Sequence, residues 1–139
     1  MGLYFFDSRA LVKNYVAKTG SIWVQTTLNA TDTNAVYAVS VTKVEVISAV
    51  LRRAKGGSIS PDEALQATYE FKFDFENEFR KIDIDDHLVE KAIDLTEKYN
   101  LRGYDAIQLA AAQGLFNEIL SSGQRICVCF FRSRIEFSG

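Results

Sequence analysis

Histidine and cysteine are scarce in this sequence, and their scarcity limits the chemistry that the chain can perform. The 139 residues include one histidine and two cysteines. A single histidine excludes a zinc site built from several histidines, and it excludes acid–base hydrolysis by a histidine pair. Two cysteines form no disulfide framework, which is typical of a reduced compartment. If the chain is an enzyme, its carboxylates are the best candidates for the catalytic groups.

Long apolar runs are also missing. The longest notable run covers residues 126–131, far short of the roughly 18 residues that a membrane span needs. The chain passes from Met1 directly into a short apolar segment and then a charged one, so we expect no secretory signal. Together with the cysteine usage, this predicts a cytoplasmic protein without a membrane partner. Apolar residues still make up 47% of the chain, which excludes disorder and suffices for the core of one domain.

Acidic charge is concentrated in the middle of the chain. Residues 1–60 carry a net charge of +4, residues 61–100 carry −7 and residues 101–139 carry +1. The overall net charge of −2 therefore hides two basic end segments. Such an asymmetry is compatible with a polyanion that approaches the basic part of the surface.

Short apolar runs alternate with stretches of helical spacing along the chain. We expect strands at residues 3–6, 35–39, 82–84 and 126–131, with helices between them, including a short one near Trp23. Strands that are apolar on both faces are typical of a parallel sheet covered by helices on both sides. The sequence therefore predicts an α/β fold with a central parallel sheet of about four strands, formed by one domain over residues 1–139.

The clearest helix start is at Ser60. A serine cap, Pro61 at the first helical position and Glu63 at the third form a strong N-terminal signal. The helix that follows places Phe71, Phe75 and Phe79 four residues apart, which predicts a buried aromatic stripe on it.

Three carboxylates follow strands or open helices, although they are far apart in sequence. Asp7 comes directly after the first strand, Glu45 lies in the first turns of the helix after the second, and Asp105 opens an alanine-rich helix. Ligands of open α/β sheets bind beyond the carboxyl ends of the strands. Three carboxylates at that edge, without histidine or cysteine, would suit Mg²⁺ or Mn²⁺.

Each of the three acids also has a local explanation. Asp7 can cap the following helix, and Glu45 stands three residues after Thr42, the spacing of a capping box. Asp105 is favourable near a helix N-terminus whatever its function. The residues alone leave both interpretations open.

Three stretches of the sequence resemble the signature regions of PIN-domain proteins. Residues 6–13, 44–49 and 102–112 read FDSRALVK, VEVISA and RGYDAIQLAAA. The resemblance is greatest to the VapC-type toxins of bacterial toxin–antitoxin pairs, and it runs in order over roughly residues 3–130.

The resemblance implies an Mg²⁺- or Mn²⁺-dependent endoribonuclease, a hydrolase that cleaves RNA phosphodiester bonds with metal-activated water. It also implies a protein antitoxin as partner and a homodimer. Asp7, Glu45 and Asp105 match the metal-binding acids of the family. The hydroxyls of Ser8 and Thr42 are either outer-shell partners of these acids or helix caps.

The chain departs from the family pattern at two places. A fourth acid usually follows the last strand, whereas residues 129–134 contain none and the next carboxylate is Glu136. We therefore expect the C-terminal part to be truncated or altered. Arg9 stands where the family has a small hydroxyl residue; it can pair with the acids, bind a substrate phosphate or lie exposed at the helix start.

Two alternatives to the ribonuclease remain. The missing fourth acid fits a catalytically weakened PIN fold that still binds an antitoxin or RNA. A carboxylate–metal phosphatase acting on small molecules is the third hypothesis, and substrate preference would distinguish it.

Overall fold

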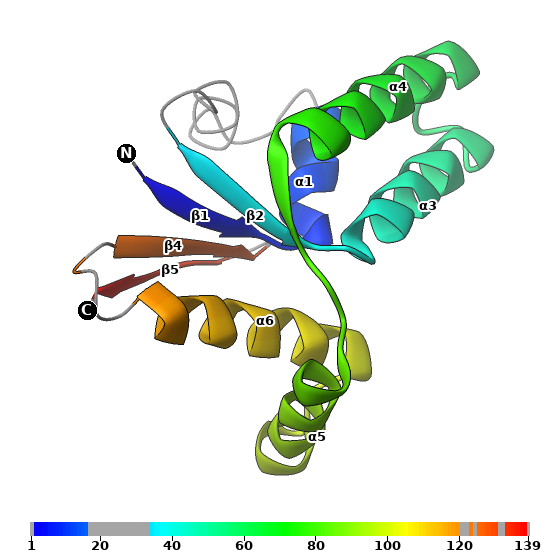
Figure 1. The fold of residues 1–139 in the computed structure, drawn as a ribbon. Coiled ribbons are helices and arrows are strands. Elements are labelled where there is room, and N and C mark those ends of the chain that lie inside the picture. The colour runs from blue at the N-terminus through cyan, green and yellow to red at the C-terminus, as the bar shows by residue number, and fades with distance from the viewer. Residues whose placement is uncertain (1, 17–33, 120–122, 124, 131–132, 139) are drawn as a thin grey trace.

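A computed structural model describes residues 2–16, 34–119, 123, 125–130 and 133–138 (Figure 1). The helix expected near Trp23 lies outside these residues. The elements are, in chain order, β1 (Leu3–Phe6), α1 (Ser8–Tyr15), β2 (Ala35–Val39), α3 (Thr42–Lys55), α4 (Pro61–Asn77), β3 (Phe79–Ile82), α5 (Asp86–Tyr99), α6 (Gly103–Ile119), β4 (Arg125–Phe130) and β5 (Ser133–Ser138).

The strands form one sheet in the order β3-β2-β1-β4-β5. The first four are parallel, which confirms the predicted α/β class and the parallel sheet of four strands. The fifth strand, β5, is antiparallel to β4 and was not predicted. Polar and apolar residues alternate over 133–138, which is typical of a strand at the edge of a sheet.

The third strand begins three residues earlier than the sequence suggests. The apolar pattern predicted a strand over residues 82–84, but β3 ends at Ile82, and Asp83 and Ile84 are exposed beyond it. Phe79, expected on the helical stripe, is the first residue of β3, since α4 ends at Asn77. The side chain of Phe79 still packs near Phe75, with 5.7 Å between ring centroids.

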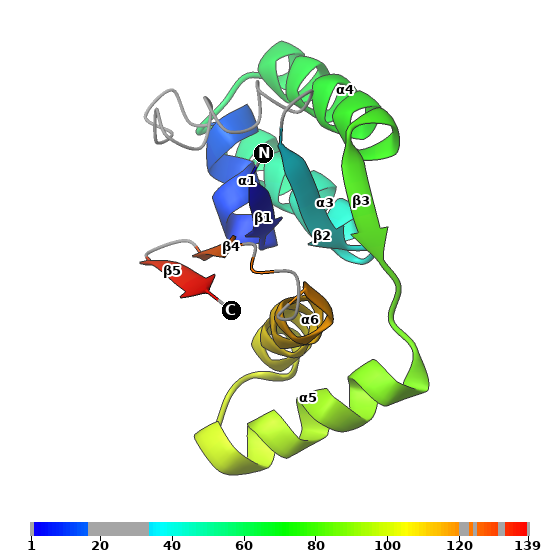
Figure 2. The ribbon, with the colours of Figure 1, turned by 60° about the vertical axis from the view of Figure 1, so that its left-hand side comes forward.

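Helices cover both faces of the sheet (Figure 2). Helices α1, α3 and α4 lie on one side, whereas α6 lies on the other side, between the sheet and α5. Strands β1, β2 and β3 contribute to both cores, because successive side chains point to opposite faces. In β1, for example, Phe6 belongs to the core under α1, α3 and α4, and Phe5 belongs to the core under α5 and α6.

Capping residues start α4, where the sequence predicts it, and α5. Ser60 and Glu63 form the reciprocal capping box of α4, with Pro61 at its first position. Asp85 caps α5 by accepting from the backbone N–H of Leu88 at 2.8 Å. None of the helices within the described residues is both long enough and apolar enough to cross a membrane.

Aromatic packing joins α4 to α1. Phe71 is fully buried, and its ring meets that of Tyr15 edge to face at 5.2 Å between centroids. The hydroxyl of Tyr15 donates to Asp74 at 2.6 Å. Burial, followed by the bond to Asp74, raises the pKa of Tyr15 well above its usual value, so the phenol stays neutral and continues to donate.

We expect Phe71→Ala to lower the free energy of unfolding by about 3–5 kcal/mol, because it empties a buried aromatic site. Urea unfolding at neutral pH measures the change. Phe73→Ala is the matched control, since Phe73 lies on the same helix with 57% of its surface exposed. Equal losses in the two variants would contradict the packing described above.

Candidate metal site

The three candidate acids lie at the edge of the sheet where the parallel strands end. The chain leaves β1 at Asp7 and enters α1, and it leaves β2 to enter α3, whose first turn carries Glu45. Helix α6 begins at the same edge and runs back along the sheet, so Asp105 in its first turn lies at this edge as well (Figure 1).

Asp7 is held firmly by the start of α1. Its side chain is only 6% exposed, and its Oδ1 accepts from the backbone N–H of Ala10 at 2.9 Å. The local interpretation of Asp7 as a helix cap is therefore correct. A carboxylate has two oxygens, so capping by Oδ1 does not exclude metal binding by the same side chain.

Thr42 and Glu45 do not form the capping box that their spacing allows. The N-cap of α3 is Val41, which makes no side-chain cap, and Thr42 is the first helical residue. The hydroxyl of Thr42 is fully buried and instead accepts from the amide nitrogen of Gln108 at 3.1 Å. Glu45, half-buried, is therefore not engaged as a cap.

The hydroxyl of Tyr104 connects helices α1, α3 and α6. It accepts from Gln108 Nε2 at 2.7 Å and makes hydrogen bonds with Ser8 and Thr42. Burial raises the pKa of Tyr104, the three hydrogen bonds oppose this rise, and the negative charge of Glu45 adds to it. The capping alternative for Ser8 is thus wrong, since Asp7 caps α1 and Ser8 faces Tyr104.

Gln108 is an almost completely buried polar residue of this network. It is 1% exposed, and its amide nitrogen donates to both Thr42 and Tyr104. Its amide oxygen finds no hydrogen-bond partner among the described residues. An unpaired buried acceptor costs about 1–3 kcal/mol of stability. An apolar side chain of similar size at this position would not carry that cost.

The two departures from the family pattern have different outcomes. Arg9 is exposed and forms no ion pair with a carboxylate of the described residues, so the expectation that it pairs with the acids is not met. Glu136 lies on β5, but its side chain is outside the described part of the structure.

The acids share one edge without meeting at one point. No group of three or more histidine, cysteine, aspartate or glutamate side chains within the described residues is close enough to hold a metal ion. The donor chemistry nevertheless fits Mg²⁺ or Mn²⁺, because the edge offers carboxylate and hydroxyl oxygens. Glu45 and Asp105 are half-buried, and rotation of such side chains is fast enough for an ion to draw them together.

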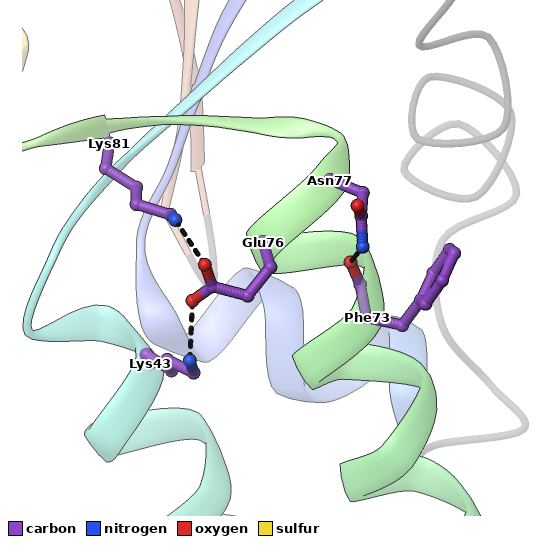
Figure 3. A network of polar contacts seen from close by, with 5 residues as sticks. All are labelled: Lys43, Phe73, Glu76, Asn77 and Lys81. Atoms are coloured by element: carbon purple, nitrogen blue, oxygen red, sulfur yellow. Dashed lines mark hydrogen bonds and ion pairs between the residues drawn. The ribbon is translucent and has the colours of Figure 1, made fainter.

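An ion-pair clamp holds the start of α3 beside the end of α4 (Figure 3). Glu76 accepts from Lys43, in the first turn of α3, at 2.6 Å and from Lys81, on β3, at 2.8 Å. The hydrogen bonds from Lys43 and Lys81 and the two positive charges lower the pKa of Glu76 from 4.5 to about 2. The clamp therefore ties together α3, α4 and β3 next to Thr42.

Comparison with protein families agrees with this geometry. The sequence pattern of the PIN domain matches residues 4–126, which is most of the chain. The chain belongs to the PIN domain family. The expected resemblance is thereby confirmed at the level of the family, and the matched range includes the three candidate acids.

Two solved structures share the fold of this PIN domain at low sequence identity. One is a toxin–antitoxin complex from Klebsiella pneumoniae, with 23% identity, a TM-score of 0.55, and coverage of 81% of this chain and 79% of that one. The other is VapBC2 from Rickettsia felis bound to a promoter DNA fragment, with 12% identity, a TM-score of 0.57 and 79% coverage of each chain. None of the curated proteins compared with the chain matches it.

Tyr104 and Gln108 were not singled out by sequence reasoning, although both stand in the third signature stretch. Their spacing of four residues places them on the same side of α6. A polar amide on the alanine-rich face of a helix was the available signal. Their partners could not be predicted, because Thr42 and Ser8 come from distant parts of the chain.

We expect Glu76→Gln to destabilise the protein at pH 7, by an amount that shrinks as NaCl is added. The folded pKa of Glu76 lies below its unfolded value, so its contribution is present above pH 4.5 and is lost as the pH falls to about 2. Urea unfolding of both proteins over this pH range measures the difference.

Glu90→Gln on α5 is the matched control, since Glu90 is exposed. Its effect on the free energy of unfolding should be small. A Glu76→Gln difference that stays constant from pH 7 to pH 2 would contradict the clamp.

Proposed function

We propose that this PIN domain, formed by residues 1–139, is a metal-dependent endoribonuclease, the toxin of a toxin–antitoxin pair. The observation that supports it best is the polar network around Tyr104, which links the neighbours of three carboxylates. Ser8 follows Asp7, Thr42 precedes Glu45 by one helical turn, and Tyr104 itself precedes Asp105.

We further propose Asp7, Glu45 and Asp105 as the ligands of Mg²⁺ or Mn²⁺. When bound, such a cation would supply an activated water and neutralise charge on the phosphodiester. The hydrogen bond from the N–H of Ala10 orients the carboxylate of Asp7, and the first turns of α3 and α6 carry Glu45 and Asp105. Arg9 is exposed one position from Ser8 and is available for a substrate phosphate.

RNA is favoured over a small-molecule substrate by the position of the acids and by the charge of the N-terminal segment. A cavity of about 440 Å³ lies between β3, α5 and α6, but none of the three acids lines it. A phosphatase for small molecules would need its carboxylates in an enclosed site of this kind. The acids instead lie at an edge to which the basic N-terminal segment contributes.

The experiment is an RNA cleavage assay with Mg²⁺ or Mn²⁺ on the wild type, Asp7→Asn, Glu45→Gln and Asp105→Asn. Asparagine retains the capping oxygen of residue 7, so folding is kept while a charged ligand is lost. We expect each variant to lose activity by about 100-fold or more. Asp86→Asn is the matched control, because Asp86 is an exposed acid in the first turn of α5.

Full activity in the three variants would contradict the assignment of the three acids as metal ligands. The alternative is a weakened PIN fold that binds RNA or an antitoxin without cleavage. It is favoured by residues 129–134, which contain no carboxylate, and by the absence of a preformed acid cluster among the described residues. A wild type that binds RNA but leaves it intact with either metal would support this alternative.

An antitoxin is the protein partner that we propose, because one structure that shares the fold is a toxin–antitoxin complex. We expect the product of a short neighbouring gene to bind the chain and to suppress cleavage. Calorimetry and the cleavage assay measure the two effects, with an unrelated antitoxin as control. Binding of both proteins with equal affinity would contradict a dedicated pair. The homodimer and the cytoplasmic location stay predictions.

A further inference from the structure

Gln108 is the polar residue among the buried side chains described on α6. The other buried residues of this helix are small or apolar: Ala106, Ala110, Ala111, Ala112 and Leu115. Such a face needs no polar group in order to pack against the sheet. The side chain of Gln108 is nevertheless as buried as its alanine neighbours. Core packing therefore does not explain why this residue carries an amide.

The amide of Gln108 joins the two helical layers of the fold. Thr42 belongs to α3 on one side of the sheet, and Gln108 belongs to α6 on the other, 66 residues away. The second hydrogen of the same nitrogen goes to the hydroxyl of Tyr104. Both donors of the amide are therefore used to connect groups that stand beside the candidate acids.

Stability alone does not account for this glutamine. Its amide oxygen is buried and has no partner among the described residues. Turning the amide by 180° would let the oxygen accept from the two hydroxyls, but the nitrogen would then be unpaired. An apolar side chain of similar length would fill the space without leaving a polar atom unsatisfied.

We propose that Gln108 is a positioning residue for the carboxylates of the candidate metal site. This inference rests on the proposed function and adds to it a residue that touches neither metal nor substrate. Gln108 holds the hydroxyls of Thr42 and Tyr104, and Tyr104 in turn holds Ser8. Through these three residues it sets the spacing of the backbone segments that carry Asp7, Glu45 and Asp105. Outer-shell partners of this kind commonly tune metal affinity.

The test is Gln108→Met, which keeps the length of the side chain and removes the amide. We expect the affinity for Mn²⁺, measured by calorimetry, to fall by about 10-fold. The urea midpoint in EDTA should stay equal or rise, since the unpaired oxygen is gone. A purely structural glutamine would give the opposite pattern, with a lower midpoint and an unchanged Mn²⁺ affinity.

Two further variants sharpen the result. Tyr104→Phe should lower the Mn²⁺ affinity similarly, and the double variant should lose no more than either single change, because both act through one network. Thr68→Val is the control, since the buried hydroxyl of Thr68 bonds, among the residues that the structure describes, only to carbonyls of its own helix, those of Ala64 and Leu65. Its Mn²⁺ affinity should equal that of the wild type.

Failure of this proposal can be told apart from failure of the proposed function. Gln108→Met with wild-type Mn²⁺ affinity and wild-type RNA cleavage would overturn the positioning role and leave the nuclease intact. A wild-type protein that neither binds Mn²⁺ nor cleaves RNA would overturn the proposed function, and the positioning role with it.

Discussion

The parallel pairing of β1 with β2 on one side and with β4 on the other is the constraint on which the rest of the structure depends. It brings the carboxyl ends of these strands to a single edge of the sheet. The chain must leave β1 and β2 at that edge, so α1 and α3 begin there, with Asp7 and Glu45 at or near their first residues. Because α6 runs back along the sheet, its first turn returns Asp105 to the same edge.

Only beyond the strand ends can the two helical layers touch. Elsewhere the sheet separates α3 from α6, and the side chains of each layer pack on their own face of the strands (Figure 2). At the edge, Gln108 reaches Thr42 and Tyr104 reaches Ser8. These contacts are polar because they lie beside helix starts, where hydroxyls and carboxylates are common. The position that suits a binding site is thus also the position where the layers are joined.

Two identical spacings in the sequence have different outcomes, and tertiary structure explains the difference. Ser60 and Glu63 form a capping box, whereas Thr42 and Glu45 do not. After β2, the N–H of Ser40 is tied to the carbonyl of Ile82 on the neighbouring strand at 2.9 Å. The turn that follows makes Val41 the N-cap, so Thr42 enters the helix and its hydroxyl is freed for Gln108.

The sequence by itself determined the features that depend on neighbouring residues. These include the α/β class, β1 and β2 at their observed bounds, the start of α4 and the presence of a carboxylate at three helix starts. They follow from apolar runs and capping residues, whose effects act within a few residues. Where each acid would lie relative to the others remained an expectation, based on the general behaviour of parallel sheets.

The tertiary structure decided the features that depend on contacts distant in sequence. The bounds of β3 follow from its pairing with β2, which places Phe79 on the strand rather than on the helical stripe. Strand β5 forms because its backbone pairs with that of β4 in the antiparallel direction. The roles of Tyr104 and Gln108 arise from hydroxyls supplied by α1 and α3. A local pattern carries no information about which distant residue will face it, since that is settled only when the sheet brings the strand ends together.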